Sequence, residues 1–407
     1  MAARAVVIGG GITGTLTALA LRRAGFGVSL VEAAHIGAGS SSRTAAGIRQ
    51  QFSTPETVLG MRYSVAFYRD FPAQVGGDTV PIQQNGYLFL LGDAAALAAA
   101  EARVAVQRAA GLREVELLRG AEARARFPFL AEDGVAGATF CPTDGFLRPE
   151  VVYQEAADAG RRAGVAVHLR APVRGARHDG RGALSAVLAG ADWLEGDLFI
   201  DATNAWSPRL GAALGATPLP IAPTKRYLWF LPREDALPAD VFASLPLIIA
   251  PDGTYCRPEN AGSLLLGRAH PAPPEPDFST DDQDRVEPAF DHRAGPDGFA
   301  VDAWARIAAA VPDFAALGGI HATTCGYYGT TPDHNPFFGF DPGVPNLIRL
   351  AGFSGHGAMF GPFTARVGAA LATAGRDLDA VPVLDGVASL APFRIGRPFD
   401  THEHLVI

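Results

Sequence analysis

The sequence contains almost no lysine. Lys225 is the only lysine among the 34 basic residues of a chain of 407. Any role that requires an amine side chain therefore has a single candidate. Cysteine is also scarce: Cys141, Cys256 and Cys325 are too few for a disulfide framework in a chain of this size. This scarcity favours a reducing compartment, and we expect a cytoplasmic protein.

Long apolar runs and basic stripes are missing as well. No stretch reaches about 18 uninterrupted apolar residues, so no membrane span is expected. Residues 5–21 follow a basic residue, as in a signal peptide, but the run is interrupted by glycines and lacks a clean small-residue cleavage site. The formal net charge is −8 and no basic residues cluster, so nucleic acid is not an expected partner.

What is present indicates a folded protein of several domains. Hydrophobic residues make up 48% and charged residues 19%, which excludes a largely disordered chain. At about 100–200 residues per domain, two or three domains are expected.

The first 32 residues carry a nucleotide-binding pattern. The apolar strand Ala5–Ile8 leads into the glycine-rich Gly9–Gly14, Thr15–Arg23 has helical apolar spacing, and Phe26–Val31 is a second strand closed by Glu32. In such a unit the glycines let a pyrophosphate approach the helix N-terminus, and the acid accepts hydrogen bonds from a ribose diol. The acid disfavours NADP because it would repel a 2′-phosphate. The pattern alone leaves NAD and FAD open.

Segments further along the chain distinguish between these two cofactors. They are residues 37–52 (GAGSSSRTAAGIRQQF), 199–207 (FIDATNAWS), 331–336 (TPDHNP) and 351–357 (AGFSGHG). In this order they resemble the FAD-dependent amine and amino-acid oxidoreductase family, which includes D-amino-acid oxidase, glycine oxidase and sarcosine oxidase. The similarity is greatest to the β-subunit branch of heterotetrameric sarcosine oxidase, and it extends over nearly the whole chain.

The resemblance implies an α/β FAD-binding domain of the glutathione-reductase-like Rossmann type and an α+β substrate domain with a mixed or antiparallel sheet. The expected FAD-binding domain is discontinuous, with residues 1–80, 145–215 and 325–407. The expected substrate domain has residues 81–144 and 216–324. The sequence agrees: helices are predicted at 150–164, 208–214 and 361–374 and strands at 165–169, 197–202 and 346–351 in the first domain. Strands at 86–91, 226–231, 245–250 and 263–267 are assigned to the second, and residues 271–284 are predicted to form an exposed loop.

The resemblance also assigns the site residues. Arg49 is expected to bind the substrate carboxylate, for which a guanidinium provides a planar bidentate clamp. Tyr255, His270 and Tyr328 are expected on the substrate side. The alternative for each tyrosine is core packing with a bonded hydroxyl, and the alternative for His270 is a satisfied or surface residue. At His356, between a strand and a helix, backbone N–H groups and the helix dipole can stabilise negative charge on the reduced flavin. The expected FAD contacts are Gly9, Gly11, Ile12, Thr13, Gly14, Glu32, Ser40, Ser41, Arg43, Thr44, Gly47, Val173, Ala202, Trp206, Gly355, His356 and Gly357.

Two positions depart from the pattern of monomeric sarcosine oxidase. Met359 stands where that enzyme has a second carboxylate ligand, a lysine, and Leu265 stands where it has the lysine associated with fast reaction with oxygen. Non-covalent FAD is expected, because Cys325 is one position away from the cysteine that carries flavin in that enzyme and residues 40–47 contain no histidine. No metal site is expected, since the His402 and His404 pair is better explained as a frayed segment.

We therefore expect an FAD-dependent oxidoreductase that oxidises the C–N bond of a secondary or N-methylated amino acid or small amine. The expected mechanism is hydride transfer to flavin N5 followed by hydrolysis of the imine. One alternative is a 2-hydroxy-acid dehydrogenase of the same fold, and another is a flavoprotein subunit or assembly partner with little activity alone. Oxygen or another compound accepts the electrons, and a partner subunit stays an open alternative.

Overall fold

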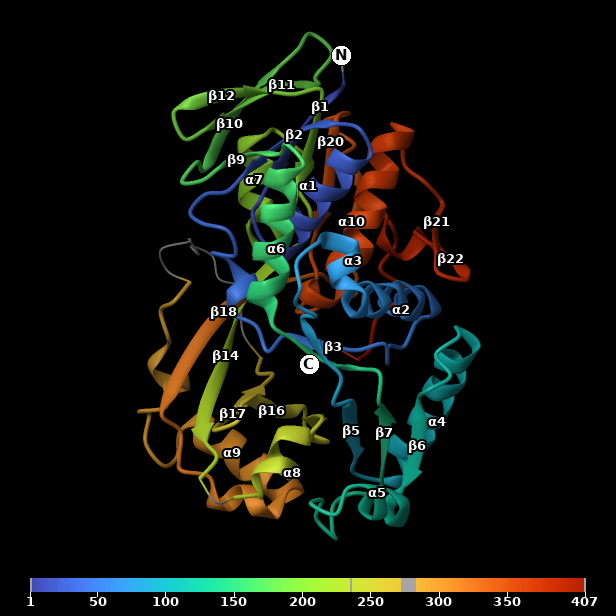
Figure 1. The fold of residues 1–407 in the computed structure, drawn as a ribbon, viewed down its shortest axis with the longest axis vertical. Helices are drawn as coiled ribbons and strands as arrows, with labels where there is room; N and C mark the ends of the chain where they lie inside the picture. Colours follow the sequence, from blue (N-terminus) through green and yellow to red (C-terminus); the bar gives the residue numbers. More distant parts are fainter. Residues whose placement is uncertain (1, 235, 272–282, 406–407) are drawn as a thin grey trace.

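The computed structural model describes residues 2–234, 236–271 and 283–405. Most of the predicted loop at 271–284 therefore lies outside the described residues. Two large sheets divide the molecule, a six-stranded sheet in the upper half of Figure 1 and an eight-stranded sheet in the lower half. Both the α/β and the mixed-sheet parts of the predicted fold class are confirmed.

The six-stranded sheet is built from segments far apart in the sequence. Val7 in the central strand pairs in parallel with Leu30 on one side and with Ile200 on the other. Only the edge strand β19 runs antiparallel to its neighbour. This is the doubly wound arrangement that the sequence predicts. The strands in spatial order are β19 (Phe337–Phe340), β20 (Leu347–Ala351), β13 (Leu198–Asp201), β1 (Arg4–Ile8), β2 (Gly27–Val31) and β9 (Ala166–His168).

Helix α1 (Ile12–Arg23) packs against α10 (Gly357–Ala374) and α6 (Pro149–Arg162). Both α1 and α10 begin earlier than predicted, so their first residues reach the end of the sheet where β1 and β20 finish. Helix α10 contains Pro362, which cannot donate to the carbonyl of Ala358 four residues before it. The Tyr68 hydroxyl donates to that carbonyl at 2.6 Å and so replaces the missing donor.

The eight-stranded sheet forms the lower half of the molecule. The long strands β14 (Ala222–Pro232) and β18 (Ala322–Thr330) pair antiparallel along their length and run side by side toward the upper half (Figure 1). The predicted domain boundary at residue 325 thus falls inside β18, which belongs to this sheet. The other strands are β17 (Ser263–Arg268), β16 (Thr254–Asn260), β15 (Leu247–Ile249), β5 (Tyr87–Leu91), β7 (Gly137–Cys141) and β6 (Glu116–Arg119).

Smaller elements connect and cover the two sheets. Helices α2 (Pro55–Arg69), α3 (Phe71–Val75) and α7 (Ser207–Ala213) belong to the upper half, and α4 (Ala94–Ala109), α5 (Gly120–Arg126), α8 (Ala239–Ser244) and α9 (Phe299–Ala310) to the lower half (Figure 1). The small sheets are β3 (Gly47–Ile48) with β8 (Gly145–Leu147) and β4 (Ile82–Gln83); β10 (Val173–His178) with β11 (Leu184–Ala189) and β12 (Asp192–Glu195); and β21 (Ala380–Val383) with β22 (Gly386–Ser389).

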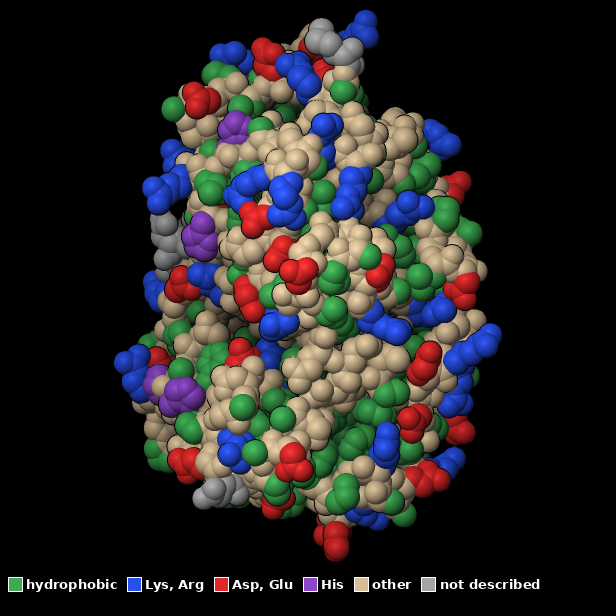
Figure 2. Space-filling model, in the orientation of Figure 1, with side chains coloured by type: hydrophobic (Ala, Val, Ile, Leu, Met, Phe, Trp, Pro, Cys, Tyr) green, Lys and Arg blue, Asp and Glu red, His purple; other side chains and the backbone are tan. Residues whose placement is uncertain are grey.

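The surface carries charges of both signs. Figure 2 shows basic and acidic side chains interspersed over the face drawn there, without a continuous basic stripe among the coloured residues. None of the helices in the described part of the chain has the length and apolar character that a membrane span requires.

Candidate functional site

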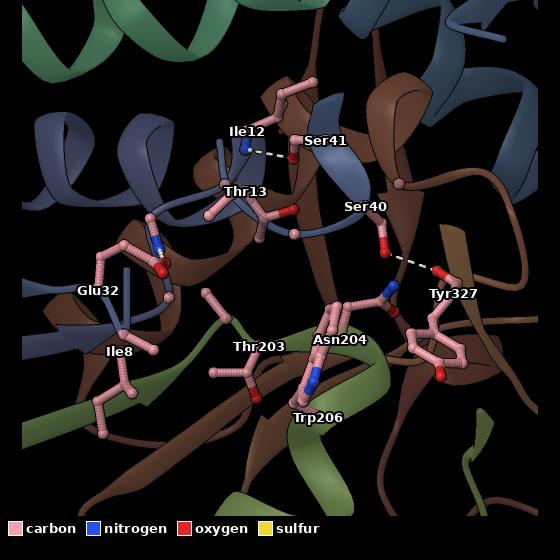
Figure 3. A pocket seen from close by; sticks show the side chains of 18 of the residues that line it. Ile8, Ile12, Thr13, Glu32, Ser40, Ser41, Thr203, Asn204, Trp206 and Tyr327 are labelled. Atoms are coloured by element: carbon pink, nitrogen blue, oxygen red, sulfur yellow. Dashed lines mark hydrogen bonds between the residues drawn. The ribbon is translucent and has the colours of Figure 1, made fainter. Parts of the chain in front are cut away.

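A cavity of about 370 Å³ opens where β1 and β13 end and α1 begins (Figure 3). The ends of parallel strands and the start of a helix are the usual place for a dinucleotide in an α/β sheet. All of the predicted FAD contacts line this cavity except Gly14, Gly47 and His356. Thr203, Asn204, Arg209 and Tyr327 also line it, and sequence reasoning missed them.

The glycine-rich turn brings backbone unusually close to backbone. Gly9 has φ +110°, and a Cβ atom there would lie 2.6 Å from the Ala202 carbonyl oxygen. A Cβ atom on Gly14 would lie only 1.8 Å from the Gly9 carbonyl oxygen. The turn therefore requires glycine at both positions, and it leaves the N-terminus of α1 facing the cavity, where a helix attracts phosphate.

Glu32 lies at the end of β2 as the sequence predicts. Its Oε2 accepts a hydrogen bond from the Gly10 N–H at 2.7 Å, and its Oε1 accepts one from the Ala34 N–H at 2.8 Å. Each carboxylate oxygen has a second lone pair, so the fixed carboxylate can also accept from a ribose hydroxyl.

The loop after β2 lines the cavity, but its polar side chains already form hydrogen bonds and ion pairs with other protein groups. Ser41 Oγ accepts from the Ile12 N–H at 3.0 Å, and Ser40 Oγ donates to the Tyr327 carbonyl at 2.6 Å (Figure 3). Arg43 forms a bidentate ion pair with Asp284, at 2.5 and 2.8 Å. These three residues shape the cavity wall and are engaged with protein groups, which sequence spacing could not reveal.

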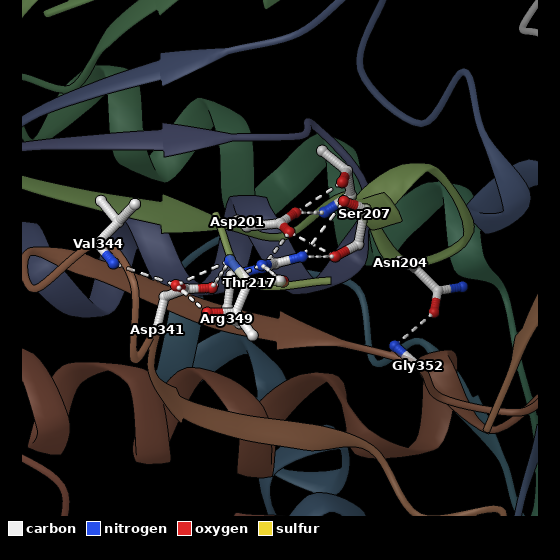
Figure 4. Close-up of polar contacts among 9 residues, drawn as sticks. Asp201, Asn204, Ser207, Thr217, Asp341, Val344, Arg349 and Gly352 are labelled. Atoms are coloured by element: carbon white, nitrogen blue, oxygen red, sulfur yellow. Dashed lines mark hydrogen bonds and ion pairs between the residues drawn. The ribbon is translucent and has the colours of Figure 1, made fainter. Parts of the chain in front are cut away.

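A buried ion network links β20 to β13 (Figure 4). Arg349 on β20 is fully buried and contacts Asp201 on β13 and Asp341, each at 2.9 Å. Asn204 Oδ1 accepts from the N–H groups of Gly352 and Phe353, both at 3.1 Å, which links the end of β13 to the loop before α10. The sequence offered a signal for this network, because β13 and β20 each carry one charged residue in an otherwise apolar strand.

A second cavity of about 40 Å³ adjoins the first. The two share Thr44, Tyr328, Gly355 and Ala358 in their linings, so they meet at the N-terminus of α10. The small cavity brings together four of the five residues predicted for catalysis, namely Arg49, Tyr255, Tyr328 and His356. Gly47 and Met359 line it as well, and Tyr87 is a lining residue that sequence reasoning missed.

Arg49 is completely buried yet has no carboxylate partner in the described part of the chain. Its Nη1 donates to the Gln51 carbonyl at 2.6 Å, and its guanidinium carbon lies 4.0 Å from the centre of the Phe52 ring. Burial lowers the pKa of Arg49 from its ordinary value. A buried cation at the wall of a cavity, without an ion-pair partner of its own, is suited to an anionic ligand.

His356 lies at the cap position of α10 and is held neutral. Its Nε2 lies 3.2 Å from Arg49 Nη2 and accepts a hydrogen bond from it. Burial and the neighbouring Arg49 charge keep the pKa of His356 well below its usual range. The imidazole therefore positions Arg49, while the backbone of Gly355 and Gly357 faces the larger cavity.

Tyr255 on β16 and Tyr328 on β18 carry the large sheet into the lining of the small cavity. Burial raises the pKa of both hydroxyls, so both are protonated. The Arg226 guanidinium carbon lies 5.5 Å from the centre of the Tyr328 ring. Its charge opposes the effect of burial on the pKa of each tyrosine.

The structure does not bring His270 to either cavity. Its ring packs among Tyr227, Phe290 and Phe299, with the ring centres of His270 and Phe290 4.2 Å apart. Burial lowers its pKa to about 4, so it is a neutral member of an aromatic cluster. The sequence left open a satisfied or surface residue as the alternative, and the burial of the ring excludes a surface position. Within the described residues no cluster of His, Cys, Asp and Glu is arranged to hold a metal ion.

Asp144 is a buried carboxylate that sequence reasoning missed. It accepts hydrogen bonds from the Gln50 N–H and Gln50 Nε2, both at 2.9 Å, and from Gln51 Nε2 at 3.2 Å. It thereby fixes the loop that follows Arg49. Burial raises its pKa to about 6, although the hydrogen bonds oppose this shift.

We expect the stability difference between wild type and Asp144→Asn to depend on pH. The folded protein holds the Asp144 proton more tightly than the unfolded chain does, so the contribution of Asp144 is fully present below pH 4 and is lost as pH rises through 6. A shift from 3.8 to about 6 corresponds to about 3 kcal/mol. Urea unfolding of both proteins at several pH values between 4 and 8 measures this difference, and a difference independent of pH contradicts the prediction.

Comparisons with a family profile, with curated proteins and with solved structures all point to FAD-dependent oxidoreductases and amino-acid oxidases or dehydrogenases. Residues 4–371 match the profile of the family described as DAO, FAD dependent oxidoreductase. FAD-dependent oxidoreductase domain-containing protein 1 of Xenopus laevis is 30% identical over 411 residues, covering 90% of this chain and 78% of that protein. Glycine oxidase of Geobacillus kaustophilus (strain HTA426) is 25% identical over 402 residues, with 96% of each chain covered. Among solved structures, L-proline dehydrogenase from P. horikoshii has a TM-score of 0.80 and 27% identity, covering 92% of this chain and 94% of that one.

Proposed function

The chain belongs to the family of FAD-dependent oxidoreductases, and from this premise we propose that it oxidises the C–N bond of a small secondary or N-methylated amino acid. The observation that carries the proposal is the position of Arg49. A buried guanidinium without an ion-pair partner among the described residues lines a cavity of about 40 Å³, and this cavity adjoins the larger one. Its size suits a small molecule, and its charge suits a carboxylate.

The larger cavity is the proposed FAD site. The glycine turn and the N-terminus of α1 suit the pyrophosphate, Glu32 suits a ribose, and the two cavities meet where the flavin ring is required. Bound there, FAD supplies the two-electron oxidation.

The residues of the chain bind and orient the substrate. Arg49 holds the carboxylate, which leaves the amine and its neighbouring C–H bond directed toward the shared wall of the two cavities. The tyrosine pair, Tyr255 and Tyr328, bounds the pocket with protonated hydroxyls. The amine reacts in its neutral form, and water hydrolyses the resulting imine. The similarity to L-proline dehydrogenase, which by its name acts on a secondary amino acid, supports this substrate class.

We expect FAD to be released intact by acid or heat. Cys325, the candidate for covalent attachment, lines neither cavity, and its Sγ donates to the Gln283 carbonyl at 3.1 Å. Burial raises the pKa of this thiol to about 11, which keeps it out of the reactive thiolate form. Flavin that stays on the denatured polypeptide in a gel would contradict non-covalent binding.

We expect reduced enzyme to react more slowly with oxygen than with a quinone or dye. Leu265 is 1% exposed and packs in a cluster with Tyr255 and Leu247, which line the small cavity. A cation at this position would stabilise superoxide in a site of low polarity, and here it is absent. Leu265→Lys should raise the rate of reoxidation by oxygen by about tenfold, which is equivalent to about 1.4 kcal/mol. Burial lowers the pKa of the introduced lysine and neutralises part of it, which reduces this gain.

Leu265→Met, a neutral side chain of similar length, is the control and should leave the oxygen rate unchanged. Stopped-flow mixing of reduced protein with oxygen and with a dye measures the rates. Wild-type enzyme that is reoxidised faster by oxygen than by the dye contradicts the expectation of slow reaction with oxygen.

Anaerobic bleaching of the flavin tests the proposed reaction. A panel of secondary, N-methylated and primary amino acids, matched amines without a carboxylate, and 2-hydroxy acids is mixed with the oxidised protein. Bleaching by the first two groups supports the proposal. Bleaching only by 2-hydroxy acids overturns it in favour of the hydroxy-acid dehydrogenase, and no bleaching by any compound favours a subunit that needs a partner chain.

A further inference from the structure

The segment Thr401–Leu405 contacts Arg49, one of the residues that line the small cavity. The carbonyl of Leu405 accepts a hydrogen bond from Arg49 Nη2, and the same nitrogen donates to His356 Nε2 at 3.2 Å. Both hydrogens of Nη2 are therefore engaged. A guanidinium binds a carboxylate bidentately through Nε and Nη2 or through Nη1 and Nη2. Because both pairs include Nη2, a bidentate clamp forms only when one of these two partners leaves.

Leu405 is the partner that can leave. His356 is 4% exposed, caps α10 and packs its ring edgewise against Phe52, with ring centres 5.1 Å apart. Leu405 is half-buried and belongs to no helix or strand. Arg49 Nε is buried without a hydrogen-bond partner among the described residues, so withdrawal of Leu405 leaves both Nε and one hydrogen of Nη2 unpaired.

Glu403 anchors the segment to the loop that carries Arg49. Its carboxylate accepts from Ser53 Oγ at 2.8 Å, from the Ser53 N–H at 3.1 Å and from the Leu405 N–H at 3.0 Å. The His404 N–H donates to Ser53 Oγ at 3.1 Å. Glu403 is 1% exposed, and Ser53 lies only four residues after Arg49. The position of the Leu405 carbonyl is thus set by a defined group of contacts.

We propose that the segment Thr401–Leu405 determines specificity, because its Leu405 carbonyl occupies Arg49 until a substrate carboxylate displaces it. The proposal rests on the proposed function, in which Arg49 binds that carboxylate. A carboxylate adds an ionic attraction to the guanidinium that a neutral carbonyl lacks, and it can accept from two N–H groups at once. Carboxylates displace Leu405 for this reason, and neutral ligands of the same shape do not. The segment thereby selects amino acids over amines.

Weakening the anchor tests the proposal in the holoenzyme. Glu403→Ala removes the acceptor for Ser53 and Leu405, and it should lower the Kd for acetate about three- to tenfold, read from the flavin absorbance. Acetamide, the neutral probe of the same shape, should bind with unchanged Kd. His402→Ala, an exposed side chain in the same segment, is the control and should change neither value. An unchanged or higher Kd for acetate in Glu403→Ala overturns the proposal.

Hydrogen exchange gives a second measurement that does not depend on the variant. Saturating acetate should speed exchange of the His404 and Leu405 amides in the wild-type holoenzyme, and acetamide should not. Slower or unchanged exchange with acetate overturns the displacement. A different result would contradict the proposed function itself. If Arg49→Met binds acetate as tightly as wild type, then Arg49 does not bind the carboxylate. If Arg49→Met loses acetate while exchange stays unchanged, only the displacement is refuted.

Discussion

Gly14→Ala is expected to yield a protein that does not retain FAD. The added Cβ atom would lie 1.8 Å from the Gly9 carbonyl oxygen and 2.9 Å from its carbon. Both atoms belong to the backbone of the turn, so no side chain can rotate to relieve the contact. Either the turn or α1 has to shift, and residues of both line the larger cavity. Overpacking of this kind costs about 1–3 kcal/mol or more, which raises the Kd for FAD by about ten- to hundredfold.

Gly160→Ala is the matched control for this prediction. Gly160 is also a glycine inside a helix, but its added Cβ would meet Val165 at 3.4 Å, an ordinary contact. This variant should keep full flavin, with equal or slightly higher stability because alanine favours the helix. The ratio of flavin to protein absorbance and a titration of the apoprotein with FAD measure the effect, and circular dichroism reports folding. Full flavin content in a folded Gly14→Ala protein contradicts the role of this close approach.

Arg49→Met is expected to weaken carboxylate binding about ten- to hundredfold while the flavin stays bound. Loss of one member of a charge-assisted pair typically costs about 1.5–3 kcal/mol. Methionine keeps the apolar stem that packs against Phe52, and it removes the charge and all five donors. The Kd for acetate, measured from the absorbance change of the bound flavin, reports the effect.

Arg49→Lys provides the comparison that separates charge from geometry. An ammonium group restores the charge but not the planar fork, so only part of the affinity should return. Each variant also loses the hydrogen bonds that Arg49 donates to the Gln51 and Leu405 carbonyls. Thermal unfolding of each variant measures the loss of stability that results. A Kd equal to that of wild type in Arg49→Met would remove Arg49 from the binding site.

The nucleotide-binding half of the site followed from local sequence. Strand, glycine turn, helix and acid succeed one another within 32 residues, and each step is set by backbone conformation and by the apolar period of its own segment. The structure accordingly places Gly9, Glu32 and the first turn of α1 around one cavity. The elements with strong periodicity were predicted to within a few residues. The exceptions are β14, which is several residues longer than predicted, and α10, which begins several residues earlier because Pro362 obscured its start.

Other parts of the site depended on which remote segments meet. His270 entered an aromatic cluster because Phe290 and Phe299 pack against it, and no pattern near His270 indicates those neighbours. Arg43 forms its ion pair with Asp284, which lies 241 positions away in the sequence. Strand β18 was missed as part of the large sheet because its partner β14 lies about a hundred residues earlier.

The sequence by itself determined the nucleotide-binding unit and the doubly wound sheet, because glycine conformation and apolar period are properties of single residues and short segments. The family resemblance of its motifs added FAD as the cofactor and Arg49 as the proposed carboxylate clamp. Only the tertiary structure decided what surrounds that clamp. The carbonyls and the imidazole that contact Arg49 come from positions as far as 356 residues away. Their contacts follow from the path of the whole chain, because a hydrogen bond between distant segments depends on where both segments are held and not on the pattern of either.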